Sequence, residues 1–223
     1  MSKLLNVSSS PHVRCGVSTK NLMYDVAIAM LPATIWGVMQ FGIYSLIVVV
    51  ATVLSCVLSE YLFETLMHKP VTISDGSALV TGMILGLNMP PAIPLWMPIL
   101  GGVFAIIVVK QLYGGLGQNW MNPALAARCF MLISFAQAMT KFTDPVTDAV
   151  ASATPLAAIK AGDTYDLAAM FIGKIPGTIG EVSVIALLIG AAYLLVKKVI
   201  TIRIPAAYIL SFAVFAFIFG QHN

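Results

Sequence analysis

Thr154 is the residue whose type and surroundings most clearly suggest a chemical role. It lies in the one long polar segment of the chain, residues 139–177. It follows two small residues, Ser152 and Ala153, and precedes Pro155. Small residues and hydroxyl groups beside a proline are typical of a turn or a helix cap. The residue types alone therefore predict a turn that presents a hydroxyl group, and they require no further chemistry.

Two glutamates form the second group of candidate residues. Glu60 and Glu64 lie one helical turn apart near the end of an apolar run, so a helix places both carboxylates on the same face. His68 and Lys69 follow shortly afterwards. We expect the two glutamates to lie at the water interface near these residues. A role in binding an ion is the alternative.

Arg128 is the third candidate, in the second turn of a helix expected at 124–138. Asn122 and Pro123 mark the start of this helix as its N-cap and its first residue. An arginine this close to a membrane segment is costly unless it is paired or its side chain reaches the interface. We expect Arg128 either to extend to the interface or to contact an anionic group of a cofactor or partner.

The composition indicates an integral membrane protein. Of the 223 residues, 59% are hydrophobic and only 9% are charged, whereas a soluble domain carries about 25% charged residues. The net charge of +3 gives no reason to expect nucleic acid as a partner. Cys15, Cys56 and Cys129 are far apart and form no C-x-x-C pair, so their spacing offers neither an iron–sulfur nor a zinc site.

Apolar runs predict the helices that position these residues. The runs at 22–39 and 41–63 form a tight hairpin, and the second is long enough for a span, which takes about 20 residues. The run at 78–88 covers only part of a bilayer and stops before three prolines, which predicts a broken helix of the kind that often carries a binding site. A simple span ending in a proline-rich loop is the alternative. Further helices are expected at 96–109, 124–138, 178–196 and 204–220.

The predicted fold class is an all-α polytopic membrane protein, and the chain divides into four parts. Residues 1–21 form an N-terminal arm that lacks the apolar core of a signal peptide. Residues 22–138 hold membrane helices including the broken one, residues 139–177 form a water-facing segment that contains Thr154, and residues 178–223 hold further membrane helices.

Basic residues predict the orientation of these helices in the membrane. If the N-terminus is cytoplasmic, nine lysines and arginines fall on the inner side, Lys110 and Arg128 among them, and three fall outside. The positive-inside rule selects this orientation. It places the N-terminal arm in the cytoplasm and Thr154 on the outer face of the membrane.

Four motifs in a fixed order give the chain a family resemblance. They are SDGSALVTG at 74–82, NPALAAR at 122–128, SATPL at 152–156 and GTIGEVS at 177–183. The chain resembles the RnfD family, the D-type subunits of the Rnf ion-translocating electron-transport complexes, which are similar to the NqrB subunits of the sodium-pumping NADH:quinone oxidoreductases. The resemblance covers almost the whole chain. It implies a fold like that of urea transporters, with two inverted repeats, of which the second is only begun here.

The resemblance also implies a cofactor at Thr154. In that family a threonine in a similar small-residue motif carries FMN through a phosphoester bond, which a separate flavin transferase forms. Two departures concern this motif, because the family pattern favours a hydroxyl where this chain has Ala151 and a glycine where it has Ser152. A second, non-covalent flavin such as riboflavin is implied as well, with no residues assigned to it.

The implied function is that of a membrane subunit with no complete active site of its own. FMN on Thr154 relays electrons between ferredoxin and NAD, and the electron flow drives Na⁺ or H⁺ outward. The implied partners are the other Rnf subunits, of types A, B, C, E and G, in a bacterial or archaeal cell membrane. A solute channel, which broken helices permit, and a structural scaffold for partner subunits are the alternatives.

Overall fold

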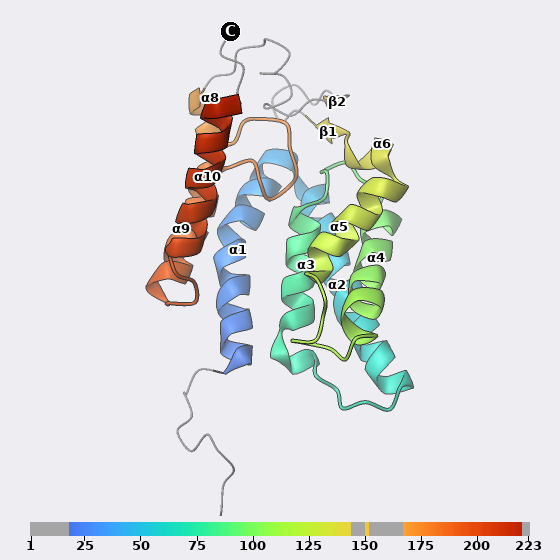
Figure 1. Ribbon diagram of the computed structural model, residues 1–223. Coiled ribbons are helices and arrows are strands. Elements are labelled where there is room, and N and C mark those ends of the chain that lie inside the picture. The colour runs from blue at the N-terminus through green and yellow to red at the C-terminus, as the bar shows by residue number, and fades with distance from the viewer. Residues whose placement is uncertain (1–17, 144–149, 152–166, 220–223) are drawn as a thin grey trace, which may run out of the picture.

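Figure 1 shows the computed structural model of the chain, a bundle in which most helix axes run roughly parallel. The structure describes residues 18–143, 150–151 and 167–219. Thr154 and most of the N-terminal arm lie outside the described residues. The described part is helical, as predicted, except for one short antiparallel strand pair that the apolar pattern did not predict.

The first two helices form the predicted hairpin. α1 spans Thr19–Phe41 and α2 spans Ile43–Leu66, and both are long and apolar enough to cross a membrane by length and composition. Gly42 joins them with a φ of 81°, a backbone conformation that favours glycine because it has no side chain. The hairpin supplies the two longest helices of the described chain, against which the shorter helices pack.

The third helix is broken, as the prolines predicted. A 3₁₀ turn, η1 (Ile73–Asp75), leads into α3 (Ser77–Leu87), and the next helix, α4, begins only at Trp96. Half of the eight residues between α3 and α4 are buried, Pro90 and Pro91 among them, while Ala92 and Pro94 are exposed. The break is therefore partly enclosed by protein, and such enclosure is the condition for irregular backbone at membrane depth.

A distant loop satisfies the carbonyl groups that the break exposes. The N–H of Gly180 donates to the Leu87 carbonyl at 2.8 Å, and the N–H of Ile179 donates to the Met89 carbonyl at 3.1 Å. A Cβ added at Gly180 would lie 2.6 Å from Leu87 Cβ, so the loop can approach α3 only because this residue is glycine. The loop thus acts as a cap for the C-terminus of α3.

α4 turns into a π-helix within the predicted helix 96–109. α4 covers Trp96–Val103, and η2 continues as a π-helix over Phe104–Gln111. In a π-helix the backbone bonds join residues five apart, as Leu112 N–H does with the Ile107 carbonyl at 3.0 Å. Lys110, which we had predicted to end the helix at the inner surface, is buried in this segment instead.

α5 begins where the sequence predicted but ends earlier. It covers Pro123–Ser134, and the Asn122 side chain caps it by accepting from the first-turn N–H groups at 3.0 and 3.3 Å. Phe135 then leaves the helical conformation with a φ of −134°, and a separate turn, α6 (Ala136–Met139), follows. The predicted helix at 124–138 is therefore two helices with a bend between them.

The short strand pair lies directly before the predicted flavin motif. β1 (Phe142–Thr143) pairs antiparallel with β2 (Val150–Ala151), with Phe142 opposite Ala151. The pairing ties the residue before Ser152 to the chain that leaves α6. Ala151, the residue before the motif, is thus paired with the chain that leaves α6.

The last part of the chain contains α8 (Leu167–Ile172), α9 (Val184–Val196) and α10 (Arg203–Phe219). The predicted start of α9 at 178 is wrong. Residues 178–180 form the loop that caps α3, and Ser183 is the N-cap of α9, accepting from Ala186 N–H at 3.3 Å. Glu181 consequently lies before α9 and not in its first turn.

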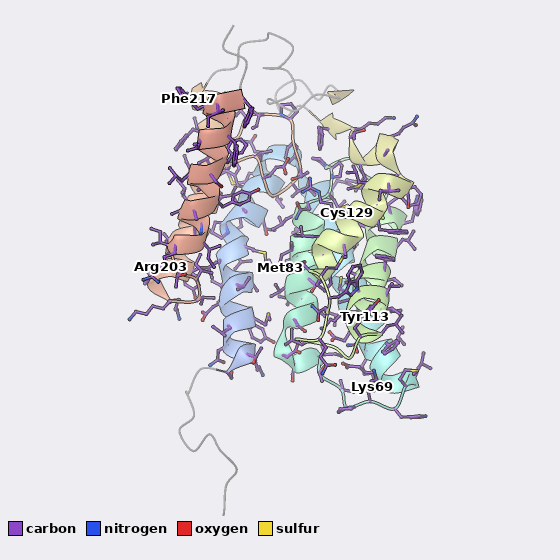
Figure 2. All side chains as sticks on the ribbon, in the orientation of Figure 1. Lys69, Met83, Tyr113, Cys129, Arg203 and Phe217 are labelled. Atoms are coloured by element: carbon purple, nitrogen blue, oxygen red, sulfur yellow. The ribbon has the colours of Figure 1, made fainter. Side chains whose placement is uncertain are left out.

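Glycines allow the helices of the bundle to approach closely. A Cβ added at Gly82 of α3 would lie 2.6 Å from Val53 Cα of α2, and one added at Gly86 would lie 3.0 Å from Val49 Cα. Two glycines four residues apart on one helix face are typical of tight helix packing in membranes. On the opposite side, Met83 of α3 packs toward α1 (Figure 2).

The two ends of the bundle carry different segments. The start of α1 and the connection from α2 to η1 lie at one end, and β1, β2 and α8 lie at the other (Figure 1). Lys69 and Tyr113 lie toward the first end and Phe217 toward the second (Figure 2). The strand β2 and the N-terminal end of α1 are therefore on opposite sides. Which side faces the cytoplasm stays a prediction.

Candidate functional site

A buried ion pair joins α2 to η2. Lys110 Nζ lies 2.5 Å from Glu60 Oε1, and the two side chains are 2% and 0% exposed. The same ammonium group donates to Ser77 Oγ, in the first residue of α3, at 2.5 Å. Three elements that are distant in the sequence therefore meet around one cation.

Further hydrogen bonds extend this pair into what we call the charge network, made of Glu60, Glu64, Thr72, Ser77, Lys110 and Gln111. Gln111 Nε2 donates to Glu60 Oε1 at 2.8 Å and to Glu64 Oε1 at 3.2 Å. The backbone N–H of Thr72 donates to Glu64 Oε2 at 2.9 Å, and its hydroxyl donates to Glu64 Oε1 at 2.5 Å. Both oxygens of Glu64 are thus satisfied.

The charge network corrects the expected position of the two glutamates. We had predicted them at the water interface beside His68 and Lys69, whereas Glu60 is 0% and Glu64 is 2% exposed. The reason is that α2 packs against α3 and η2, so its glutamate face meets protein and not water. The alternative, that these carboxylates bind an ion, stays a prediction.

The charge network carries one more negative charge than positive charge. The ammonium group of Lys110 contacts Glu60, and Glu64 is linked to this pair through Gln111. Glu60 Oε2 is buried without a hydrogen-bond partner. An uncompensated charge in a protein interior is costly, and it is normally removed by a proton or paired with a counter-ion. One buried oxygen, Glu60 Oε2, is the vacant acceptor of this network.

A cavity of about 360 Å³, which we call the polar pocket, opens beside Lys110 between α1, α3 and the start of α5. Its hydrogen-bonding wall is formed by Ser77, Thr81, Lys110, Asn119 and Asn122. Apolar side chains such as Met23 and Ile84 form the rest. Asn119, which lines the pocket together with Lys110, has a buried Oδ1 without a hydrogen-bond partner. Apolar walls with a few placed polar groups are typical of cavities that bind small molecules.

Arg128 lies at the broken end of α3. Its Nη1 donates to Asn88 Oδ1 at 2.6 Å, and its Nη2 lies 4.0 Å from Glu181 Oε2. The Arg128 and Glu181 side chains are 38% and 46% exposed, so this ion pair contributes only about 0–1 kcal/mol. Arg128 is therefore paired within the chain, while its extension to the interface and its contact with an anionic group of a cofactor or partner stay predictions.

The burial of Lys110 also changes the orientation count. Lys110 belongs to the charge network and is 2% exposed, whereas Arg128 is 38% exposed and keeps its place in the count. Eight basic residues then remain on the predicted inner side against three on the outer side. The positive-inside rule still selects the same orientation.

A second cavity of about 400 Å³ lies between α1, α3 and α9. Its walls are mostly apolar, and Ile84 lines both this cavity and the polar pocket. The Thr178 hydroxyl lines it too and is buried without a partner. The two cavities thus lie on either side of one residue of α3.

Thr154, the predicted cofactor anchor, lies outside the described residues. The strand that precedes it, β2, lies at the opposite end of the bundle from the start of α3 and hence from the charge network (Figure 1). The structure therefore brings Glu60 and Glu64 together in one network with Lys110, and β2 lies away from this network.

Sequence reasoning missed the residues that hold the glutamates. Ser77 lies in the motif at 74–82 and Lys110 and Gln111 follow the apolar run at 96–109, and the sequence connects none of them with Glu60. The available signal was a Lys-Gln pair that directly follows an apolar run, 96–109, which had no capping residue at its end.

The chain matches the NQR2, RnfD, RnfE family over residues 6–223. It is 47% identical to the D subunit of the Na⁺-translocating ferredoxin:NAD⁺ oxidoreductase complex of Acetobacterium woodii, over 97% of this chain and 70% of that protein. It is 39% identical to the D subunit of the proton-translocating ferredoxin:NAD⁺ oxidoreductase complex of Clostridium ljungdahlii, with the same coverage. The D subunit of the ion-translocating oxidoreductase complex of Methanosarcina acetivorans is 31% identical, over 96% of this chain and 69% of that protein.

Proposed function

The chain belongs to the NQR2, RnfD, RnfE family, and we propose that it is the D subunit of a membrane complex that couples electron transfer between ferredoxin and NAD⁺ to ion translocation. The observation that carries the proposal is the 47% identity to such a subunit across 97% of this chain. Its partners are the other subunits of that complex. The coupling ion is Na⁺ or H⁺, and the first two relatives are named for one ion each.

The buried charge network supports a role in ion translocation. Ionisable side chains inside membrane helices are rare, and they typically lie on the paths of ions or protons. Glu60 and Lys110 are such residues, since they are buried between apolar helices. The broken helix α3 supports the related proposal of a urea-transporter-like fold with inverted repeats, because such folds place their sites at discontinuous helices.

FMN bound covalently to Thr154 is the proposed electron relay of this subunit. The threonine would serve as an anchor, with its hydroxyl oxygen in a phosphoester bond formed by a flavin transferase. Support comes from the small residues Ser152 and Ala153 beside Thr154 and from the strand pair that holds the preceding residue, Ala151. FMN supplies the electron-accepting ring, while protein groups around it set its potential.

The polar pocket is the proposed site of the second, non-covalent flavin. The flavin ring has a pyrimidine edge that offers both an N–H donor and carbonyl acceptors. The unpaired Asn119 Oδ1 fits the ring N–H, and the Lys110 ammonium fits its carbonyl side. Apolar residues such as Met23 and Ile84 fit the ring faces. Lys110 is the one charged residue among those that line the pocket, so it would stabilise negative charge on a ligand held there.

Deletion and complementation test the proposed function. Membrane vesicles from cells that lack this subunit are expected to lose reduced-ferredoxin-dependent NAD⁺ reduction and the ion gradient that accompanies it, and the wild-type chain is expected to restore both. The measurements are NADH absorbance and Na⁺ or proton uptake in inverted vesicles. Electron transfer that continues at the full rate without the subunit would contradict the proposal and favour a solute channel.

Cysteine labelling tests the proposed orientation. Thr140→Cys, at an exposed position between α6 and β1, is expected to react in intact cells with an impermeant maleimide. Val71→Cys, exposed between α2 and η1, is expected to react only after the membrane is opened. Both changes are made in a chain whose native cysteines are replaced by alanine. Labelling of position 71 but not position 140 in intact cells would reverse the orientation.

A further inference from the structure

Lys110 is shared between the polar pocket and the charge network. Its side chain lines the pocket, and its ammonium group contacts both Glu60 Oε1 and Ser77 Oγ at 2.5 Å. The exposed fraction of Lys110 is only 2%, so water does not screen its interactions on either side. Charge that enters the pocket therefore acts directly on the counter-ion of Glu60.

Glu60 has a place for a proton that Glu64 lacks. Both carboxylate oxygens of Glu64 accept hydrogen bonds, whereas Glu60 Oε2 is buried and accepts none. The other titratable groups that act on Glu60 are Cys56 on the same helix and Asp75 on η1, besides Lys110 and Glu64. Lys110 is the one cation among these groups, so it alone compensates the negative charge of the Glu60 carboxylate.

We propose that Lys110 links the charge of a flavin in the polar pocket to the protonation of Glu60, so that the first electron delivered to the pocket draws one proton onto Glu60 Oε2. This inference rests on the proposed occupant of the polar pocket. The electron comes from the ferredoxin-linked donor of the complex, and the proton comes from water. One O–H bond forms at Glu60, and no other bond of the protein changes.

The coupling follows from competition for one ammonium group. Negative charge in the pocket attracts Lys110 and weakens its compensation of Glu60. A buried carboxylate without a counter-charge is costly, and a proton on Oε2 removes that cost. Linkage is reciprocal, so protonation of Glu60 releases Lys110 toward the pocket and makes reduction there more favourable. Electron and proton uptake consequently support each other.

The experiment is a potentiometric titration of the non-covalent flavin in the purified, intact complex at several pH values. One proton per electron shifts the midpoint potential by about 59 mV per pH unit, because a tenfold change in the equilibrium constant of a one-electron couple corresponds to that value. The wild-type complex is expected to show a slope of this size. Glu60→Gln, which leaves Lys110 and Glu64 as a balanced pair, is expected to lose most of it.

A matched control and a second readout separate this role from a structural one. Asp25→Asn makes the same chemical change at an acid of α1 that pairs with Tyr193 and Lys197, outside the charge network, and is expected to leave the slope unchanged. Redox-difference infrared spectra of the wild-type complex are expected to show a protonated carboxyl band in the reduced state. That band is expected to be absent in Glu60→Gln and present in Asp25→Asn.

Lys110→Met tests the link itself. The single variant leaves two buried carboxylates without a cation, so the yield of the chain in the purified complex is expected to be low. The double variant Lys110→Met with Glu60→Gln removes one carboxylate as well, so its yield in the purified complex is expected to be higher. Its flavin midpoint potential is expected to be lower than that of the wild type and to be independent of pH.

The possible results separate the inference from the proposed function. In one outcome, acid-extractable flavin is present and the pH slope of its potential in Glu60→Gln equals that of the wild type. This outcome overturns the inference and leaves the proposed function standing. A potential that follows the Na⁺ concentration and not pH also overturns it. A wild-type complex without acid-extractable flavin overturns both the inference and the proposed occupant of the polar pocket.

Discussion

Replacing Thr154 by alanine is expected to remove covalent flavin from the subunit completely, because the change deletes the hydroxyl oxygen that we propose forms the phosphoester bond. The loss of a hydroxyl from a polar turn typically costs less than about 0.5 kcal/mol of stability, so the helices are expected to fold and insert normally. Electron transfer through the complex is expected to fall to background. The measurement is in-gel flavin fluorescence of the denatured subunit, together with NAD⁺ reduction by the membranes.

Other hydroxyl residues of the same segment provide the controls. Thr154→Ser keeps an oxygen at the same position and is expected to retain part of the flavin. Thr147→Ala and Thr164→Ala remove the neighbouring threonines, neither of which follows a pair of small residues, and are expected to keep all of it. Peptide mass spectrometry locates the modification. Unchanged fluorescence in Thr154→Ala, or an FMN mass increment on another residue, would assign the anchor elsewhere.

The positions of the helices could be predicted because they depend on local sequence. The hairpin of α1 and α2 follows from two long apolar runs separated at Gly42, and the structure confirms both helices. The break after Leu87 follows from the prolines beyond it, which cannot continue a helix. The start of α5 follows from Asn122 and Pro123. In each case the deciding residues lie within a few positions of the boundary.

The start of α9 could not be predicted in the same way. Residues 178–180 are compatible with a helix, but two of them donate hydrogen bonds to carbonyl groups of Leu87 and Met89, about 90 positions earlier in the chain. Those carbonyl groups are free only because α3 ends there. A tertiary hydrogen bond therefore decides a local boundary, and helix propensity does not contain that information.

Only part of the charge network could be predicted from the sequence. The spacing of Glu60 and Glu64 correctly placed the two carboxylates on one face of α2, and the structure confirms that both bond to Gln111. Their burial was missed because it requires Lys110 to turn inward, 50 residues later in the chain. The π-helical turn that carries Lys110 has no sequence signature comparable to a cap or a proline. A lysine that ends an apolar run is therefore compatible with either a surface or a buried position.

Gly190→Val is expected to separate α9 from α1, because a Cβ at this position would lie 2.2 Å from the backbone carbonyl oxygen of Ala29. A backbone atom cannot rotate away, so α9 would have to shift as a whole. That shift would also break the Tyr193 hydroxyl bond to Asp25, 2.8 Å long, and the 3.5 Å contact of Lys197 with the same carboxylate. Overpacking of a tight contact typically costs about 1–3 kcal/mol, and the lost polar contacts add to it.

Ala192→Val provides the matched control for this change. Ala192 lies two positions further along α9 on an exposed face, so the same valine adds volume without meeting α1. The thermal unfolding midpoint of the purified subunit is the measurement. It is expected to fall by several degrees for Gly190→Val and by little for Ala192→Val, since a cost near 3 kcal/mol is a large part of the stability of a typical domain, about 5–15 kcal/mol. Equal midpoints for the two variants would show that α9 does not pack on α1 through Gly190.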